Sequence, residues 1–131
     1  MRRGGGLVWL ATAIYLAVLG WILFGEDARF LRRAAVDVYA TLNDAMPAAL
    51  RPVHYEIVLY ALLFVPLGWL ALRLTGRTAA WVACGCVWLT VMVELAQTGL
   101  LDRSGSAVDV LASSLGAIIG VLLGQAGTKR A

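Results

Sequence analysis

Four long apolar segments, separated by shorter polar stretches, dominate the pattern of this chain. They cover residues 7–25, 53–74, 79–101 and 106–124. Each approaches the roughly 20 residues that a helix needs to cross the hydrocarbon core of a bilayer. The first exceeds the apolar core of a signal peptide and has no small-x-small cleavage site, so we interpret it as a retained anchor. The sequence predicts an all-α membrane protein, a four-transmembrane-helix bundle that forms a single membrane domain over residues 1–131.

The connections between these segments differ in length. The two later ones are short, so the second, third and fourth spans should be consecutive antiparallel neighbours. The fourth span is itself short and is expected to stand steeply in the bilayer. The first connection, residues 26–52, is long, and residues 30–45 within it have helical periodicity with separate apolar and charged faces. We interpret this segment as an amphipathic helix lying in the membrane interface, with a connector packed on the bundle end as the alternative.

Composition agrees with a membrane protein and helps to orient it. Of the 131 residues, 61% are hydrophobic and only 15% are charged, and the formal net charge is +3. The basic residues lie beside the apolar segments, without interleaved aromatic side chains, so we expect no nucleic-acid partner. Basic residues in the short segments favour a cytoplasmic-membrane protein with both termini in the cytoplasm. The expected partner is the lipid bilayer. A homo-oligomer is also possible, because a transporter with four spans per chain would need a dimer to form a path across the membrane.

Several polar residues lie within or beside the apolar segments, where a charged side chain is costly. Antiparallel threading places Glu56, Glu94, Gln97 and Asp109 at one end of the bundle, which we call the polar end. Arg103, in the last short connection, could bridge Glu94 and Asp109. Three interpretations stay open for this cluster. It could tie the helices together, with Asp109 facing the positive start of its helix; it could bind a ligand; or it could catalyse a reaction.

Other motifs indicate packing rather than chemistry. Small residues recur every four positions in the fourth segment, a pattern that lets another helix approach closely; they are Ala112, Gly116, Gly120 and Gly124. In the second segment, Pro66, followed by Gly68, leaves a backbone carbonyl without its helical partner and should kink the helix. Cys84 and Cys86 point to different faces of one helix and are interpreted as small apolar fillers.

The single histidine is a candidate metal ligand. His54 could join Glu56, Glu94 and Asp109 at the polar end, but the four residues follow no recognised ligand spacing. We therefore expect no metal and no cofactor. The sequence also contains no nucleophile-elbow, zinc-protease or phosphate-loop motif.

From Tyr55 to Gly124 the chain resembles the VanZ-like family of bacterial membrane proteins. The resemblance rests on Y-A-L-L-F-V-P-L-G at residues 60–68, E-L-A-Q at residues 94–97, Arg103, and D-V-L-A-S-S-L-G at residues 109–116. Tyr60 and Ser113 stand where the family usually has asparagine. Both residues form hydrogen bonds, but neither has the paired donor and acceptor of an amide.

The resemblance implies membership of a group whose named member is linked to low-level teicoplanin resistance, but it implies no known reaction. We favour a non-enzymatic cell-envelope protein that binds a lipid-linked cell-wall intermediate, a glycopeptide-type ligand or a partner protein at an outward-facing polar end. The alternative is a small intramembrane enzyme acting on a polyprenyl phosphate or a lipid head group, with Glu94 or Asp109 as acid or base. An enzyme acting on phosphate would normally need several cations or a metal, which favours the first interpretation.

Overall fold

The computed structural model describes residues 4–25, 30–42, 45, 51–100 and 106–128, and these residues form five helices and no strand. The helices are α1 (Gly4–Phe24), α2 (Phe30–Leu42), α3 (Pro52–Thr75), α4 (Ala79–Leu100) and α5 (Ala107–Thr128). Four of them, α1, α3, α4 and α5, are long and apolar enough to cross a membrane. The predicted all-α bundle with four spans is confirmed.

Three helix ends differ by three or four residues from the sequence-based boundaries. Helix α1 begins at Gly4, before the predicted residue 7. The amphipathic helix α2 ends at Leu42, before the predicted residue 45. The last helix, α5, continues past Gly124 to Thr128, so the fourth span is not short. Gln125 and the residues after it are too polar or too small to extend an apolar run, but they still propagate a helix that packing has already fixed.

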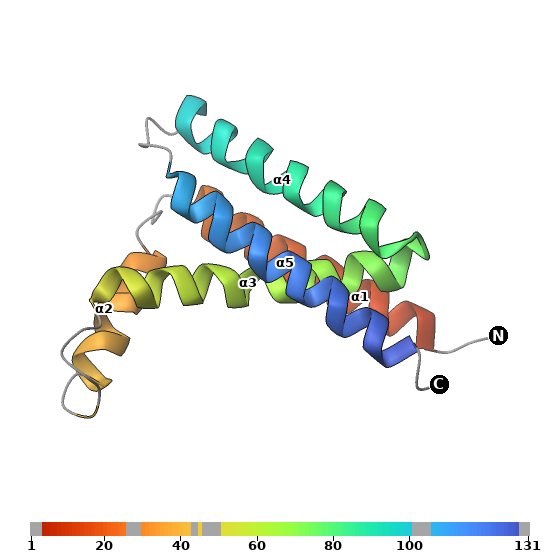
Figure 1. Ribbon diagram of the computed structural model, residues 1–131, viewed down its shortest axis with the longest axis horizontal. Coiled ribbons are helices and arrows are strands. Elements are labelled where there is room, and N and C mark those ends of the chain that lie inside the picture. Colours follow the sequence, from red (N-terminus) through yellow and green to blue (C-terminus); the bar gives the residue numbers. More distant parts are fainter. Residues whose placement is uncertain (1–3, 26–29, 43–44, 46–50, 101–105, 129–131) are drawn as a thin grey trace.

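The four long helices alternate in direction, so both ends of the described chain lie at one end of the bundle (Figure 1). The hairpin between α3 and α4 lies at this end as well. It is tight because Gly76 adopts the left-handed conformation, with φ of 59°, and its amide donates to the Leu72 carbonyl at 3.2 Å. The polar end, opposite, gathers the last turns of α1 and α4 and the first turns of α3 and α5.

Helices α3 and α5 form the most extensive helix pair in the bundle. A Cβ on Gly116 would lie 2.0 Å from the Ala61 carbonyl oxygen, and one on Gly120 would lie 2.0 Å from that of Val65. Gly68 makes the reciprocal approach from α3 to α5. The two backbones touch directly, so the small-residue stripe packs within the chain, on α3.

The other helices surround this pair. Helix α4 packs mainly on α5 and touches α3 less. The buried core between the spans is formed by aromatic and aliphatic side chains from all four of them, including Leu19, Phe64, Val82, Ala117 and Val121. Helix α3 runs through Pro66 without a break, and the Tyr15 hydroxyl of α1 donates to the Leu63 carbonyl one turn earlier at 2.7 Å.

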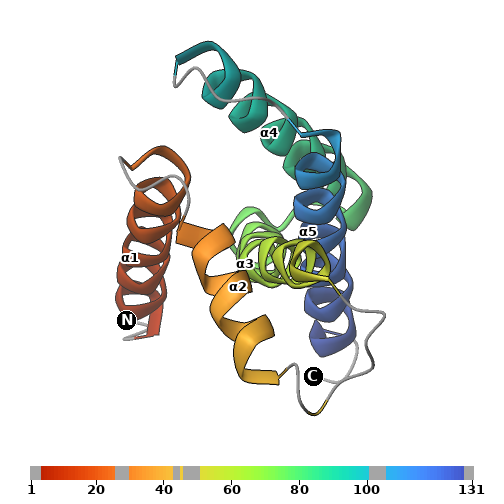
Figure 2. The same cartoon turned by 90° about the vertical axis from the view of Figure 1, so that its left-hand side faces the viewer.

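The short helix α2 runs transverse to the long helices beside the first half of α3 (Figures 1 and 2). Its Ala35 is buried, whereas Arg32, Val36 and Asp37 are exposed. The Tyr39 ring packs edge-on against the Tyr55 ring of α3, with centroids 6.0 Å apart. This direction suits a helix lying in the membrane interface, which stays a prediction.

Candidate functional site

The structure gathers most of the predicted cluster at the polar end. Glu56 lies half-buried in the second turn of α3, and Asp109 lies half-buried in the first turn of α5. Glu94 is half-buried and Gln97 is buried, both in the last turns of α4. Arg103 and its predicted bridge between Glu94 and Asp109 lie outside the described residues.

Two other predicted residues lie deeper in the bundle. Tyr60 is 3% exposed and belongs to the core on α3, and Ser113 is 5% exposed on α5. The residues that stand in place of the family's asparagines are therefore enclosed by helices rather than presented at the surface of the polar end.

Glu94 completes the start of α5. Ser106 occupies the N-cap position, and its hydroxyl oxygen accepts the amide of Asp109 at 3.4 Å. The Ser106 amide in turn donates to Glu94 Oε1 at 2.5 Å. In a capping box, a carboxyl group of the same helix usually accepts the N-cap amide. Here a carboxylate from the neighbouring helix takes that role, and its negative charge faces the positive end of α5.

Gln97 completes the end of α1 in the same way. Its Nε2 donates to the Leu23 carbonyl at 2.7 Å, and the contact is buried. The last carbonyls of a helix have no partner within the helix and must find one elsewhere, above all where water is scarce. Gln97 supplies that donor and ties α4 to α1.

A third polar residue continues the same face of α4 into the bundle. Thr90 lies one turn before Glu94, and its hydroxyl lies 2.8 Å from the Ser114 hydroxyl of α5 in a buried contact. Thr90, Glu94 and Gln97 therefore form a polar stripe at helical spacing whose contacts reach α5 twice and α1 once. The stripe works as a set of hydrogen-bonded ties between spans.

His54 also forms a hydrogen bond at a helix end, the start of α3. Its Nδ1 accepts the amide of Arg51, the N-cap residue of α3, at 3.0 Å. Within the described part of the chain, no three His, Cys, Asp or Glu side chains come close enough to hold a metal ion. His54 and the three carboxylates Glu56, Glu94 and Asp109 are thus not brought together as a metal site.

Among the described residues, the polar end contains one buried side-chain hydroxyl without a hydrogen-bond partner. The Tyr55 hydroxyl is buried, and it has no hydrogen-bond partner among the described residues. It lies on the first turn of α3, where Tyr39 of α2 packs against its ring. A buried hydroxyl without a partner is uncommon in native proteins and calls for an explanation.

A charged hollow lies on α2 at the same end. It has a volume of about 390 Å³ and is lined by Arg32, Arg33, Val36 and Asp37. Sequence reasoning singled out neither Tyr55 nor Arg32 as a functional residue. The signal was weak: a tyrosine near the start of a span suits the membrane interface in any case, and adjacent arginines are common beside spans.

Comparison with known proteins identifies one relationship. The family model described as VanZ/LLP1 matches residues 9–126, which extends the resemblance noted from residue 55 onward to α1 and α2 as well. No curated protein and no solved structure gives a significant match to the chain.

Proposed function

Given that this chain belongs to the VanZ/LLP1 family, we propose that it is a cell-envelope membrane protein that binds a lipid-linked cell-wall intermediate at its polar end. In this proposal the polar end faces outward from the cytoplasmic membrane. The ligand is held by its phosphate group and is not chemically changed. Teicoplanin resistance belongs to the family level and is not transferred to this chain.

The observation that most supports this function is the orphaned hydroxyl of Tyr55. It is buried next to Tyr39 of α2 and has no partner among the described residues, so an acceptor on a bound ligand would satisfy it. A hydrogen bond to a charged acceptor is worth about 1.5–3 kcal/mol, more than one to a neutral group. A phosphate oxygen is such an acceptor.

Charge and placement favour a lipid-linked phosphate over the other ligands considered. Arg32 lines a hollow on α2, the helix that runs transverse to the spans. A ligand held there would meet a cation beside the ends of apolar helices, which suits a molecule with an anionic head and a polyprenyl tail. A glycopeptide or a partner protein has no polyprenyl tail and would not need the apolar helix surface beside the cation.

The polar stripe of α4 argues for binding rather than catalysis. A general acid or base must reach the substrate, but one carboxylate oxygen of Glu94 is engaged with the Ser106 amide. The positive charge of Arg32 on α2 suits recognition of an anion.

The test uses the full chain in nanodiscs and a polyprenyl diphosphate as the probe. We expect Tyr55→Phe to weaken binding about tenfold, the value of one hydrogen bond to a charged group, without lowering the melting temperature. Arg32→Gln should weaken binding as well, whereas Arg73→Gln removes the same charge from the last turn of α3, at the opposite end of the bundle, and serves as the control. Unchanged binding in both polar-end variants would refute the proposal, and release of phosphate from the probe by the wild type would establish an enzyme instead.

A further inference from the structure

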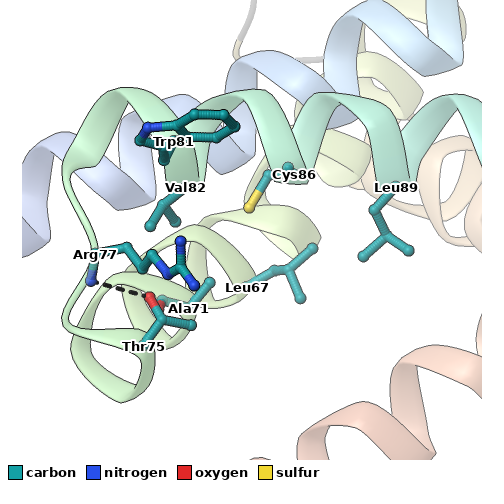
Figure 3. A pocket seen from close by; sticks show the side chains of 9 residues that line it. Leu67, Ala71, Thr75, Arg77, Trp81, Val82, Cys86 and Leu89 are labelled. Carbon is teal, nitrogen blue, oxygen red and sulfur yellow. Dashed lines mark hydrogen bonds between the residues drawn. The ribbon is translucent and has the colours of Figure 1, made fainter.

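A second binding feature lies at the other end of the bundle, between α3 and α4. It is a pocket of about 370 Å³ next to the hairpin, within the range of about 300–1,000 Å³ that is usual for small-ligand sites. Figure 3 shows side chains from both helices lining it. This pocket is separate from the polar end and plays no part in the function proposed above.

The pocket is built from three rows of side chains at four-residue spacing, one on α3 and two on α4. On α3 the row is Leu67, Ala71 and Thr75, and on α4 the rows are Trp81, Gly85 and Leu89 with Val82 and Cys86 beneath them. Val82 and Cys86 are buried and form an apolar floor. The space at Gly85 is open, since a Cβ there would meet nothing within 4 Å. The result is an apolar groove with a notch halfway along one wall.

Polarity in this groove is concentrated at the hairpin. Thr75 and Arg77 are its polar members, and both lie at that end. Figure 3 shows the Arg77 side chain reaching from the hairpin into the space between the two helices. Among the described residues its guanidinium has no carboxylate or hydrogen-bond partner; only its backbone amide is engaged, with Thr75 Oγ1 at 3.4 Å. A cation without a partner among the described residues thus lies at the hairpin end of an apolar groove.

The length of the groove fits one leaflet of a bilayer. From Ala79, where α4 begins, to Leu89 the helix rises about 15 Å. That is about half of the roughly 30 Å hydrocarbon core. Trp81 is 72% exposed beside Arg77, as expected of an aromatic residue at head-group depth.

We propose that this groove holds one anionic phospholipid of the adjacent leaflet, with an acyl chain along Leu67, Gly85 and Leu89 and its phosphate on Arg77. The lipid head group is attracted to Arg77 by its opposite charge, and the acyl chain makes apolar contacts along the groove. The lipid neutralises Arg77 and fills the gap that remains where α4 touches α3 only sparsely.

The test compares two lipids on the full-length protein after delipidation in a non-ionic detergent. Phosphatidylglycerol and phosphatidylcholine with identical acyl chains are titrated, and bound lipid is counted by native mass spectrometry. The wild type should retain one phosphatidylglycerol, about fivefold more tightly than phosphatidylcholine, the value of one arginine facing an anionic head group. Equal retention of the two lipids would overturn the proposal.

Two matched variant pairs locate the lipid. Arg77→Gln should abolish the preference, whereas Arg73→Gln should keep it, because Arg73 lies outside the groove with its guanidinium 5.4 Å from the Trp69 ring. Gly85→Leu should fill the notch and lower binding of both lipids, whereas Gly20→Leu, at an equally open glycine of α1, should not. Equal effects within either pair would overturn the site. A change of oligomeric mass in Gly85→Leu would assign the groove to a second copy of the chain and would also overturn the proposal.

Discussion

At the scale of single residues, the polar side chains inside these apolar helices mostly complete helix ends. Glu94 accepts the first free amide before α5, Gln97 donates to a last carbonyl of α1, and His54 accepts the N-cap amide of α3. A buried backbone group without a partner costs about 1–3 kcal/mol. A carboxylate in a membrane helix costs about 2.5–3.5 kcal/mol on insertion scales. The capping contact offsets part of that cost, so Glu94 need not be explained by catalysis.

The capping role of Glu94 predicts a graded effect on stability. Glu94→Gln keeps an oxygen that can accept the Ser106 amide and loses only the charge at the helix start, so it should cost about 0.3–1 kcal/mol. Glu94→Ala leaves the amide without a partner and should cost about 1–3 kcal/mol. The measurement is thermal unfolding of both variants in detergent. If the two variants melt at the same temperature, the hydrogen bond to Ser106 contributes nothing to stability.

Removing the hydroxyl group should affect stability differently at two tyrosines. The Tyr15 hydroxyl donates to the Leu63 carbonyl, so Tyr15→Phe should lower stability by about 1 kcal/mol. The Tyr55 hydroxyl is buried without a partner among the described residues, so Tyr55→Phe should leave stability unchanged or raise it. Unfolding of the two variants in the same detergent makes the comparison. A loss in Tyr55→Phe as large as that in Tyr15→Phe would show that its hydroxyl is already satisfied.

At the scale of helices, the α3–α5 pair fixes the fold. The two backbones approach within the reach of a single methyl group at Gly68, Gly116 and Gly120. Close approach of small residues is what holds helices together when the surrounding lipid is as apolar as the side chains. This pair keeps the first turns of α3 and α5 at the same end of the bundle, the polar end.

Substitution of glycine by alanine should therefore have different effects on stability at different glycines. Gly120→Ala would place a Cβ 2.0 Å from the Val65 carbonyl oxygen and should destabilise the bundle by about 1–3 kcal/mol or more. Gly85→Ala meets open space and should be neutral or slightly stabilising, because alanine favours the helix. Folded yield in membranes and melting in detergent measure both. Equal tolerance of the two substitutions would contradict the packing of α5 on α3.

Much of this element-level arrangement follows from the sequence, but not all of it. The apolar runs predicted four spans, and the four-residue spacing of small side chains predicted a close helix contact. The spacing does not say which helix makes the contact, because a stripe of small residues suits a neighbour in the same chain or in another. The extension of α5 to Thr128 was missed because polar residues end an apolar run without ending a helix.

At the scale of the whole molecule, alternating spans bring Glu56, Glu94 and Asp109 to one end, as antiparallel threading predicted. What they do there could not be predicted. Glu94 and Gln97 bond to backbone atoms of Ser106 and Leu23, and no side-chain pattern marks a backbone group as a partner. The orphaned Tyr55 hydroxyl is likewise visible only once α2 has packed over its ring.

The bundle presents two chemically different ends, and their sides of the membrane can be tested. We expect the termini and the α3–α4 hairpin to face the cytoplasm. In a background without Cys84 and Cys86, Thr98→Cys near the polar end should react with an impermeant maleimide in intact cells. Thr78→Cys in the hairpin should react only after the membrane is permeabilised. The reverse labelling pattern would show that the polar end, with its proposed ligand, faces the cytoplasm.

The most direct measurement is the affinity of Glu94→Gln for polyprenyl diphosphate, set beside that of Tyr55→Phe in the same nanodiscs. If Glu94 caps α5 and Tyr55 meets the ligand, Glu94→Gln should bind within about twofold of the wild type, because its capping oxygen is kept and its stability changes little. Tyr55→Phe should lose about tenfold. A folded Glu94→Gln protein that no longer binds, beside a Tyr55→Phe protein that binds normally, would contradict both assignments.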